Sequence, residues 1–106
     1  MTLRQDKISS TIKKLAGEFI NLESDRESMI TPIGANISKD LKNATIYVTI
    51  FPENKEEESL EFLKRKRSDF REFFKNQIKI KTIPYFDFEI DTGEKNRQRI
   101  EELSAK

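Results

Sequence analysis

The residues with the clearest chemical meaning are the lysines and arginines between Leu60 and Thr82. This stretch holds eight cations against three acidic residues, a local charge of +5 in a chain of 106 residues whose formal net charge is only +1. Clustered cations neutralise phosphates, so such a cluster is typical of nucleic-acid binding whose affinity falls steeply with salt. We expect one phosphate-contacting surface, made of Lys64, Arg65, Lys66, Arg67, Arg71, Lys75, Lys79 and Lys81.

This cationic cluster also has a simpler explanation, because most charged runs are solvated helix ends. Two features favour binding instead: the run Lys64 to Arg67 interrupts an apolar stripe of helical spacing, and further cations follow it. A straight helix would turn Lys66 or Arg67 toward the core, where a long cation is not expected. We therefore predict that the chain bends beside Ser68, whose hydroxyl can bond the local backbone. The bend would let all four cations reach water.

Two further groups of side chains are candidates for the same surface. Lys39 and Lys42 flank a short connector, where they either extend the cationic surface or simply keep a turn soluble; both interpretations stay open. Tyr47, Phe51 and Tyr85 could stack on RNA bases, as aromatic residues on RNA-binding sheets do. We favour the simpler interpretation that Tyr47 and Phe51 cover the second face of a sheet or a neighbouring helix end.

Three carboxylates near the C-terminal end suggest a different chemistry. Asp87, Glu89 and Asp91 alternate with apolar residues, which would place them on one face of a strand, and such a set could hold Mg²⁺ for a nuclease. Simple amphipathic alternation predicts the same pattern, and no cleaving motif accompanies it. We favour the amphipathic interpretation, with no metal site. An acidic strand face would repel phosphate, so RNA should approach by the pair of helices that carries the cationic cluster and not across this strand.

The composition excludes several classes of protein. The chain has no Cys and no His, so a disulfide framework, thiolate or imidazole metal sites and a nucleophile paired with His are all ruled out. Charged residues make up 37 % of the chain, yet eight Phe and two Tyr stand at periodic positions, which favours a folded domain. The N-terminus lacks an apolar signal core, and no apolar run approaches about 20 residues, so the cytoplasm is the expected compartment.

The first half of the chain is predicted to form a helix and two strands. Apolar residues from Leu3 to Leu22 recur at helical spacing. A basic amphipathic helix can lie on a membrane surface, but this one has no Trp and an ordinary lysine content, so core packing is favoured. Strands are expected over Pro32–Ser38, with Ile33 facing inward, and over Ala44–Phe51. Their short polar connector predicts an antiparallel pair.

The second half is predicted to form a bent helix pair, a strand and a tail. Pro52 ends the second strand, and Asn54 with Glu57 has the pattern of a helix N-cap and capping box. After the helix pair, a third strand is expected at Tyr85–Ile90. A short helix or turn is expected at 94–103.

The expected order is helix, strand, strand, helix, helix, strand. This order matches the type II KH arrangement, an α+β fold with the helices on one face of a three-stranded sheet. We predict a KH-like domain over residues 1–93 and a short C-terminal helix or tail over 94–106. Nothing in the sequence argues for a dimer, so a monomer is expected.

Three segments carry a pattern that spans nearly the whole chain. A strand ends in a Ser/Asp/Leu turn and continues into an Ala-x-Ile-Tyr-Val strand, at Ser38, Asp40, Leu41, Ala44, Ile46, Tyr47 and Val48. A basic-apolar alternation then leads through a proline to a Phe-bearing strand, at Ile80, Ile83, Pro84, Phe86, Phe88 and Asp91. The tail adds Arg99, Ile100, Glu101, Glu102 and Leu103. In this order the segments resemble the ribosome-binding factor A family.

The resemblance implies a KH-like RNA-binding protein that is not an enzyme and needs no cofactor. Its partner would be the 16S rRNA of the free or immature small (30S) ribosomal subunit, near the 5′-terminal helix, with no membrane or small-molecule substrate. It would support late 30S maturation and 16S rRNA processing, notably in the cold. Two rivals stay open: a protein–protein interaction module of the same fold, and a Mg²⁺-dependent nuclease.

One departure from the family concerns the bend. The family lacks the GxxG loop of other KH domains and usually has Ala-x-Gly where two helices meet, whereas this chain has Lys66, Arg67 and Ser68. We expect Ser68 to set the bend in place of Gly, although serine is less permissive. The expected RNA-binding residues are Lys39, Lys42, Lys64, Arg65, Lys66, Arg67, Ser68, Arg71, Lys75, Lys79 and Lys81.

Overall fold

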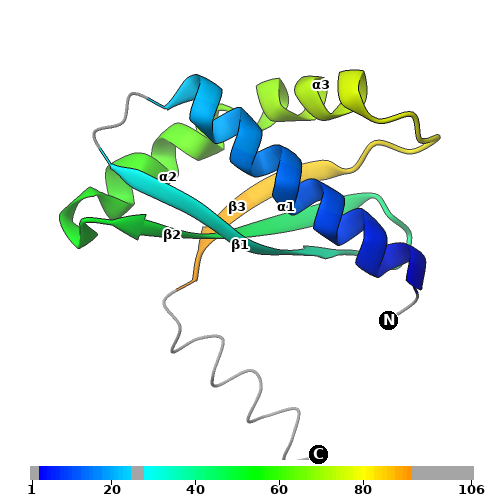
Figure 1. Ribbon diagram of the computed structural model, residues 1–106, viewed down its shortest axis with the longest axis horizontal. Helices are drawn as coiled ribbons and strands as arrows, with labels where there is room; N and C mark the ends of the chain where they lie inside the picture. Colours follow the sequence, from blue (N-terminus) through cyan, green and yellow to red (C-terminus); the bar gives the residue numbers. More distant parts are fainter. Residues whose placement is uncertain (1–2, 25–27, 92–106) are drawn as a thin grey trace, which may run out of the picture.

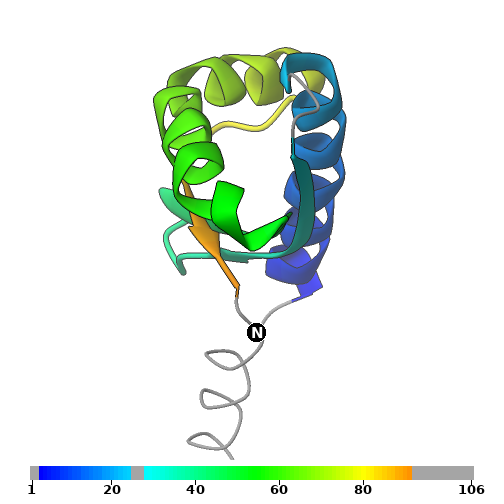
Figure 2. The ribbon, with the colours of Figure 1, turned by 90° about the vertical axis from the view of Figure 1, so that its left-hand side faces the viewer.

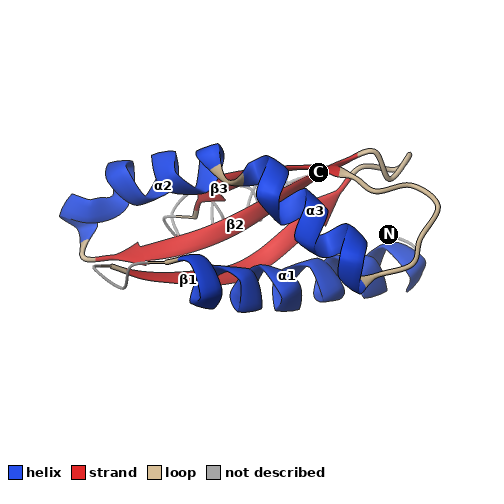
Figure 3. Cartoon of the chain, turned by 90° about the horizontal axis from the view of Figure 1, so that it is seen from above, coloured by secondary structure: helices blue, strands red, loops and turns tan. Residues whose placement is uncertain are grey.

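The predicted order of helices and strands is present in the computed structural model, which describes residues 3–24 and 28–91. The three helices cover one face of a three-stranded sheet (Figures 1 and 3). The elements are α1 (Leu3–Glu23), β1 (Met29–Ile37), β2 (Asn43–Phe51), the 3₁₀ turn η1 (Glu53–Lys55), α2 (Glu56–Arg65), α3 (Arg67–Gln77) and β3 (Tyr85–Ile90). The prediction of an α+β fold is confirmed.

The sheet has the strand order β1-β2-β3. As predicted, β1 and β2 pair antiparallel, while β3 lies parallel to β2 after the crossover through α2 and α3. This is the connectivity of a type II KH domain, so that prediction is also confirmed. In this order β2 is the central strand and β3 is an edge strand. Side chains of α2 and α3 can therefore reach β3 from the edge that has no neighbouring strand.

The core lies between the helices and the inner sheet face. Apolar side chains of α1 are fully buried at Ile12 and Ala16, and the alternation in β2 buries Ile46 and Val48. Phe70 of α3 is the centre of the aromatic contacts: its ring lies 4.7 Å from Phe86, 5.3 Å from Phe19 and 6.0 Å from Phe88, measured between centroids. One side chain thus joins α1, α3 and β3.

The first strand differs from its prediction in two respects. It begins at Met29, three residues earlier than expected, and Ile33 is partly exposed at 40 % although it was expected to face inward. The pairing passes from Pro32 opposite Val48 to Gly34 opposite Tyr47, so Ile33 is the extra residue of a β-bulge. Pro32 has no N–H to donate, and a strand accepts such a residue at an edge or a bulge.

The predicted capping box at Asn54 and Glu57 is wrong. The residues Glu53–Lys55 form the 3₁₀ turn η1, and α2 begins only at Glu56, with Lys55 in the N-cap position and no side-chain capping bond. The turn takes Asn54 out of the position where its side chain would cap α2. The acidic first turn of α2 still faces the positive end of the helix dipole.

The predicted bend between two helices is present, but the structure places it at Lys66 and not beside Ser68. Lys66 has φ −94° and ψ 7°, while its N–H bonds back to Phe62 and Leu63 and its carbonyl accepts from Phe70. Ser68 is an exposed residue in the first turn of α3. The expectation that Ser68 sets the bend is therefore wrong.

The helix or turn predicted at 94–103, within the predicted tail 94–106, lies outside the described residues. Among the described residues, no helix combines the length and the apolar character needed to cross a membrane.

Candidate nucleic-acid interface

Lys64 and Arg67 lie on either side of the bend and share one acidic partner. Lys64 Nζ lies 3.0 Å from Asp87 Oδ1, and Arg67 Nη1 lies 3.3 Å from the same oxygen. Arg67 Nε also donates to the carbonyl of Lys64, which holds the two side chains together across the break. The two cations therefore present a net charge of +1 to a phosphate, although both are partly exposed.

Asp87 responds to this environment through its pKa. Partial burial raises the pKa of Asp87, but hydrogen bonds from the Lys64 ammonium and the Phe88 N–H, together with the charges of Lys64 and Arg67, outweigh that effect and hold it below its ordinary value. The carboxylate is thus ionised at neutral pH. Among the described residues, no group of three or more potential ligands is placed to hold a metal ion.

Lys66 is surrounded by acidic side chains as well. Its Nζ lies 3.4 Å from Glu23 of α1 and 3.6 Å from Asp69 of α3, and it stands 5.9 Å from the centre of the Phe62 ring. These contacts link the bend to the end of α1. Arg65, by contrast, is exposed at the last position of α2.

Arg71 is engaged with the protein backbone. Its Nε and Nη2 donate to the carbonyls of Pro84 and Ile83 over 3.1 and 3.0 Å, and its guanidinium lies 4.4 Å from the centre of the Tyr85 ring. This geometry ties α3 to the segment that leads into β3. The donors that would grip a phosphate are thus occupied, which weighs against Arg71 as a phosphate contact.

The remaining predicted cations gather at the end of α3 and in the loop after it. Lys75, Lys79 and Lys81 are exposed and form no ion pair with any described residue. They line an open hollow of about 480 Å³ whose other walls are Ile78, Ile80 and Ile83. The loop alternates lysines toward water with half-buried isoleucines against the core, as the sequence pattern predicts.

The connector between β1 and β2 lies at this same end of the molecule, where Tyr85 N–H donates to the carbonyl of Lys42. Ser38 donates to Asp40, and Asp40 accepts from the N–H of Lys42. The Ser38 hydrogen bond and then the Lys42 N–H hold the pKa of Asp40 below its ordinary value. This bonded turn, with Leu41 at φ 63°, presents exposed Lys39 and Lys42 in a defined conformation.

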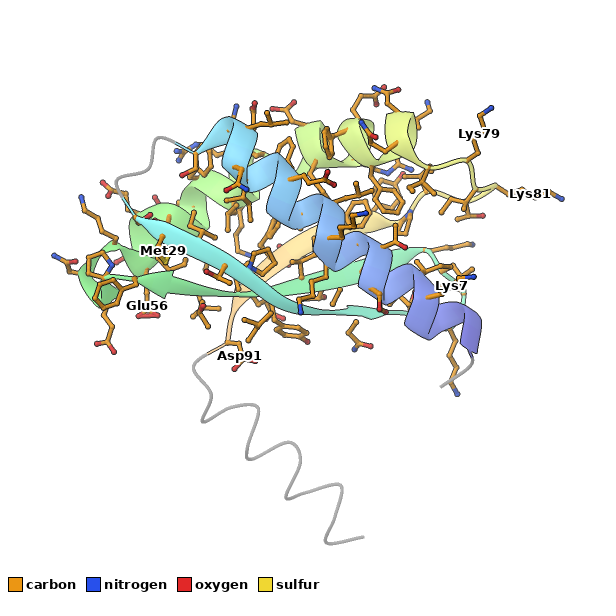
Figure 4. The ribbon with its side chains drawn as sticks, in the orientation of Figure 1. Lys7, Met29, Glu56, Lys79, Lys81 and Asp91 are labelled. Atoms are coloured by element: carbon orange, nitrogen blue, oxygen red, sulfur yellow. The ribbon has the colours of Figure 1, made fainter. Side chains whose placement is uncertain are left out.

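One cation of this region was missed in the sequence. Lys7 of α1 lies at the same end as Lys79 and Lys81 (Figure 4). In the sequence, Lys7 stands out only as a residue outside the apolar stripe of α1. Its place beside the other lysines follows from the topology: β1 runs back along α1, so the β1–β2 connector lies near the start of α1. We name as the basic end the residues Lys7, Lys39, Lys42, Lys75, Lys79 and Lys81.

Apart from exposed Arg65 and the backbone-bonded Arg71, the structure divides the predicted cations into two groups. The bend group of Lys64, Lys66 and Arg67 is paired with acidic side chains, while the lysines of the basic end are exposed and form no ion pair with any described residue. Phosphate binding requires uncompensated cations, so the basic end has the stronger electrostatic case.

Comparison with known proteins supplies independent information. The family model "Ribosome-binding factor A" matches residues 4–104. A ribosome-binding factor A from Clostridium botulinum is 33 % identical over 104 residues, covering 94 % of this chain and 87 % of the relative. The crystal structure of ribosome-binding factor A from Thermus thermophilus is similar with a TM-score of 0.71 and 25 % identity, covering 81 % of this chain and 94 % of that one.

A further solved structure gives the same fold. It is a model of the Thermus thermophilus protein fitted into a cryo-EM map of a 30S–RbfA complex, with a TM-score of 0.66 and 20 % identity, covering 76 % of this chain and 88 % of that one.

Proposed function

The chain belongs to the ribosome-binding factor A family, and from that premise we propose that it binds the small ribosomal subunit and supports its late maturation. The match of the family model to residues 4–104 carries the proposal. The relative from Thermus thermophilus, which occurs in a 30S–RbfA complex, supports the choice of the small subunit as partner. The 16S rRNA would be the component bound, near its 5′-terminal helix.

The proposed mechanism is stoichiometric binding without catalysis. A protein that binds one rRNA conformation more tightly than another shifts the equilibrium between them by that difference in affinity, and by no more. The protein would hold one conformation during maturation and 16S rRNA processing and then leave. No cofactor is required for such a role.

We assign the predicted residues different weights within the RNA surface. Lys75, Lys79 and Lys81, with Lys39 and Lys42, would contact phosphates directly because they are exposed and unpaired with described acids. Arg65 would add an exposed cation, and Lys64, Lys66 and Arg67 a weaker contribution because acids already compensate them. We expect Arg71 and Ser68 to contribute least.

The test is co-sedimentation of the purified protein with small subunits at low and moderate salt, with large subunits and a protein-free RNA duplex for comparison. We expect selective binding to small subunits that weakens with salt. Replacing Lys79→Gln and Lys81→Gln should lower the slope of log affinity against log salt by about 1.5, since each phosphate contact contributes about 0.7–0.9.

A matched control removes two exposed lysines from the middle of α1, Lys13→Gln and Lys14→Gln, and should leave the slope unchanged. Equal affinity for small subunits, large subunits and the RNA duplex would indicate a cationic domain without selectivity. Binding whose affinity does not change with salt concentration would instead favour a protein–protein module.

A further inference from the structure

The end of the molecule opposite the basic end carries exposed apolar side chains. Met29 and Phe51 are directly paired across β1 and β2, and they are 69 % and 71 % exposed. Beside them an open hollow of about 450 Å³ is lined by Ile20, Ile30 and Pro52 among others. We name as the apolar end patch the exposed Met29 and Phe51 with the half-buried Ile30 and Pro52, beneath which Ile20 is buried. Large side chains grouped in this way at a surface mark an interaction site more often than isolated ones do.

The rim of the apolar end patch is mostly acidic, although Arg65 and Lys55 line a neighbouring hollow that shares Ile30 with the patch. The turn η1 and the first turn of α2 follow directly after Phe51 and Pro52 and carry Glu53, Glu56, Glu57 and Glu58 against one cation, Lys55. Figure 2 looks onto this end, with η1 and α2 in front, and Figure 4 shows Met29 and Glu56 together, far from Lys7, Lys79 and Lys81. A surface of this kind repels phosphate and attracts cations.

We propose that the apolar end patch binds a protein segment of the small ribosomal subunit whose apolar side chains are flanked by lysine or arginine. The inference rests on the proposed function, in which the basic end binds rRNA. The acidic end, which we define as the glutamates of η1 and the first turn of α2, would then face away from phosphates or toward protein. The exposed pair Met29 and Phe51 supplies the apolar contact, and the glutamates of η1 and α2 select a basic partner.

A second copy of this chain fits the patch less well. A two-fold symmetric dimer would bring the same acidic rim of both copies together, and the like charges would oppose association. A head-to-tail contact would satisfy the charges, but it would cover the basic end that the proposed function assigns to RNA.

The experiment places a photo-reactive benzoylphenylalanine at Phe51 and, as a matched control, at Tyr85, an aromatic residue that is 66 % exposed and pairs with Asn43 beside the basic end. Both proteins are bound to purified small subunits, irradiated and separated. We expect crosslinks from position 51 to a ribosomal protein and from position 85 to rRNA.

A second measurement uses the variant Met29→Ser with Phe51→Ser, checked for an unchanged fold by circular dichroism. Its affinity for small subunits should fall about tenfold, while its affinity for protein-free 16S rRNA stays constant. Ile33→Ser, a partly exposed apolar residue in the middle of β1, should change neither.

Each outcome decides between the hypotheses. Crosslinks from position 51 to rRNA, to a second copy or to nothing would overturn this inference while leaving the proposed function intact, as would equal losses of affinity for subunits and bare rRNA. If the wild-type protein failed to sediment with small subunits, the proposed function and the inference would both be wrong.

Discussion

Asp87 shows how a single residue can alter the charge of a surface. Its carboxylate accepts from both Lys64 and Arg67, which stand 23 and 20 residues away in the chain. Exposed ion pairs of this kind contribute little to stability, typically about 0–1 kcal/mol, because solvent screens them. Their larger effect is electrostatic: they halve the charge that the two cations offer to a phosphate.

The lowered pKa of Asp87 makes a prediction for stability against pH. Because its folded-state pKa lies below the unfolded value, the ion pair stabilises the folded state fully above the unfolded pKa, near 4, and loses that effect as pH falls through the folded pKa. We therefore expect Asp87→Asn to lower the free energy of unfolding by about 1 kcal/mol or less at pH 6. The difference from the wild type should shrink steadily below about pH 4.

Urea unfolding at a series of pH values measures this difference. Glu89→Gln, an exposed residue of the same strand, is the control and should keep the wild-type curve. A stability difference for Asp87→Asn that stayed constant from pH 6 to pH 2 would show that the charge of Asp87 is not its source.

At the scale of elements, Arg71 joins α3 to the segment that precedes β3. Its guanidinium spans the carbonyls of Ile83 and Pro84 and covers the Tyr85 ring, so the loop that carries Lys79 and Lys81 is fixed at its far end. The arrangement uses the planar, forked shape of the guanidinium, which a lysine cannot reproduce.

Replacing Arg71→Ala should therefore destabilise the fold more than it weakens RNA binding. We expect a loss of about 2 kcal/mol in the free energy of unfolding, since hydrogen bonds from charged groups contribute about 1.5–3 kcal/mol and the site is partly exposed. Arg71→Lys should lose an intermediate amount. Urea denaturation gives the stability, and the salt slope of RNA binding should stay at the wild-type value. Unchanged stability with a shallower salt slope would return Arg71 to the phosphate-contacting set.

The layers and the strand order were predictable because each depends on local periodicity. The alternation of apolar residues in β2 and the apolar stripe of α1 predict which side chains are buried. The short connector between β1 and β2 favours an antiparallel pair. The sequence predicted that a bend separates the two helices, but it did not predict the residue at which the bend lies. With the bend at Lys66, Leu63 and Phe70 on either side of it are both fully buried, whereas Ser68 is exposed.

The site was less predictable because pairing joins residues that are distant in sequence. Counting charges between Leu60 and Thr82 included the cations and Asp69 but not the partners Glu23 and Asp87, which lie outside that range. Lys7 and the connector between β1 and β2 lie at the basic end only because of how the helices and strands are arranged in space. The β-bulge at Ile33 likewise depends on the register against β2, which no pattern within β1 contains.

At the scale of the molecule, the charges are separated along the strands. Lysines gather where β2 begins, and glutamates gather where it ends (Figure 4). A strand of nine residues spans about 30 Å, at about 3.3 Å per residue. The separation exceeds the Debye length of about 10 Å at 0.1 M salt but matches that of about 30 Å at 0.01 M. The acidic end can therefore influence phosphate at the basic end only when salt is low.

Neutralising the acidic end, with Glu56→Gln, Glu57→Gln and Glu58→Gln, tests this separation. At about 0.01 M salt the variant should bind any RNA more tightly than the wild type, because the long-range repulsion between these glutamates and the phosphates is lost. At about 0.15 M salt the affinities of the variant and the wild type should be equal. The same change should lower the free energy of unfolding by about 1–2 kcal/mol, since three carboxylates leave the positive end of α2. Fluorescence titration with a short RNA duplex and urea denaturation measure the two effects. Replacing Glu18→Gln, Glu61→Gln and Glu89→Gln, three exposed residues outside the first turn of α2, removes the same number of charges and is the control for a change in net charge alone. A gain in affinity that persisted at 0.15 M salt would mean that RNA reaches the acidic end itself, and it would contradict the assignment of RNA to the basic end.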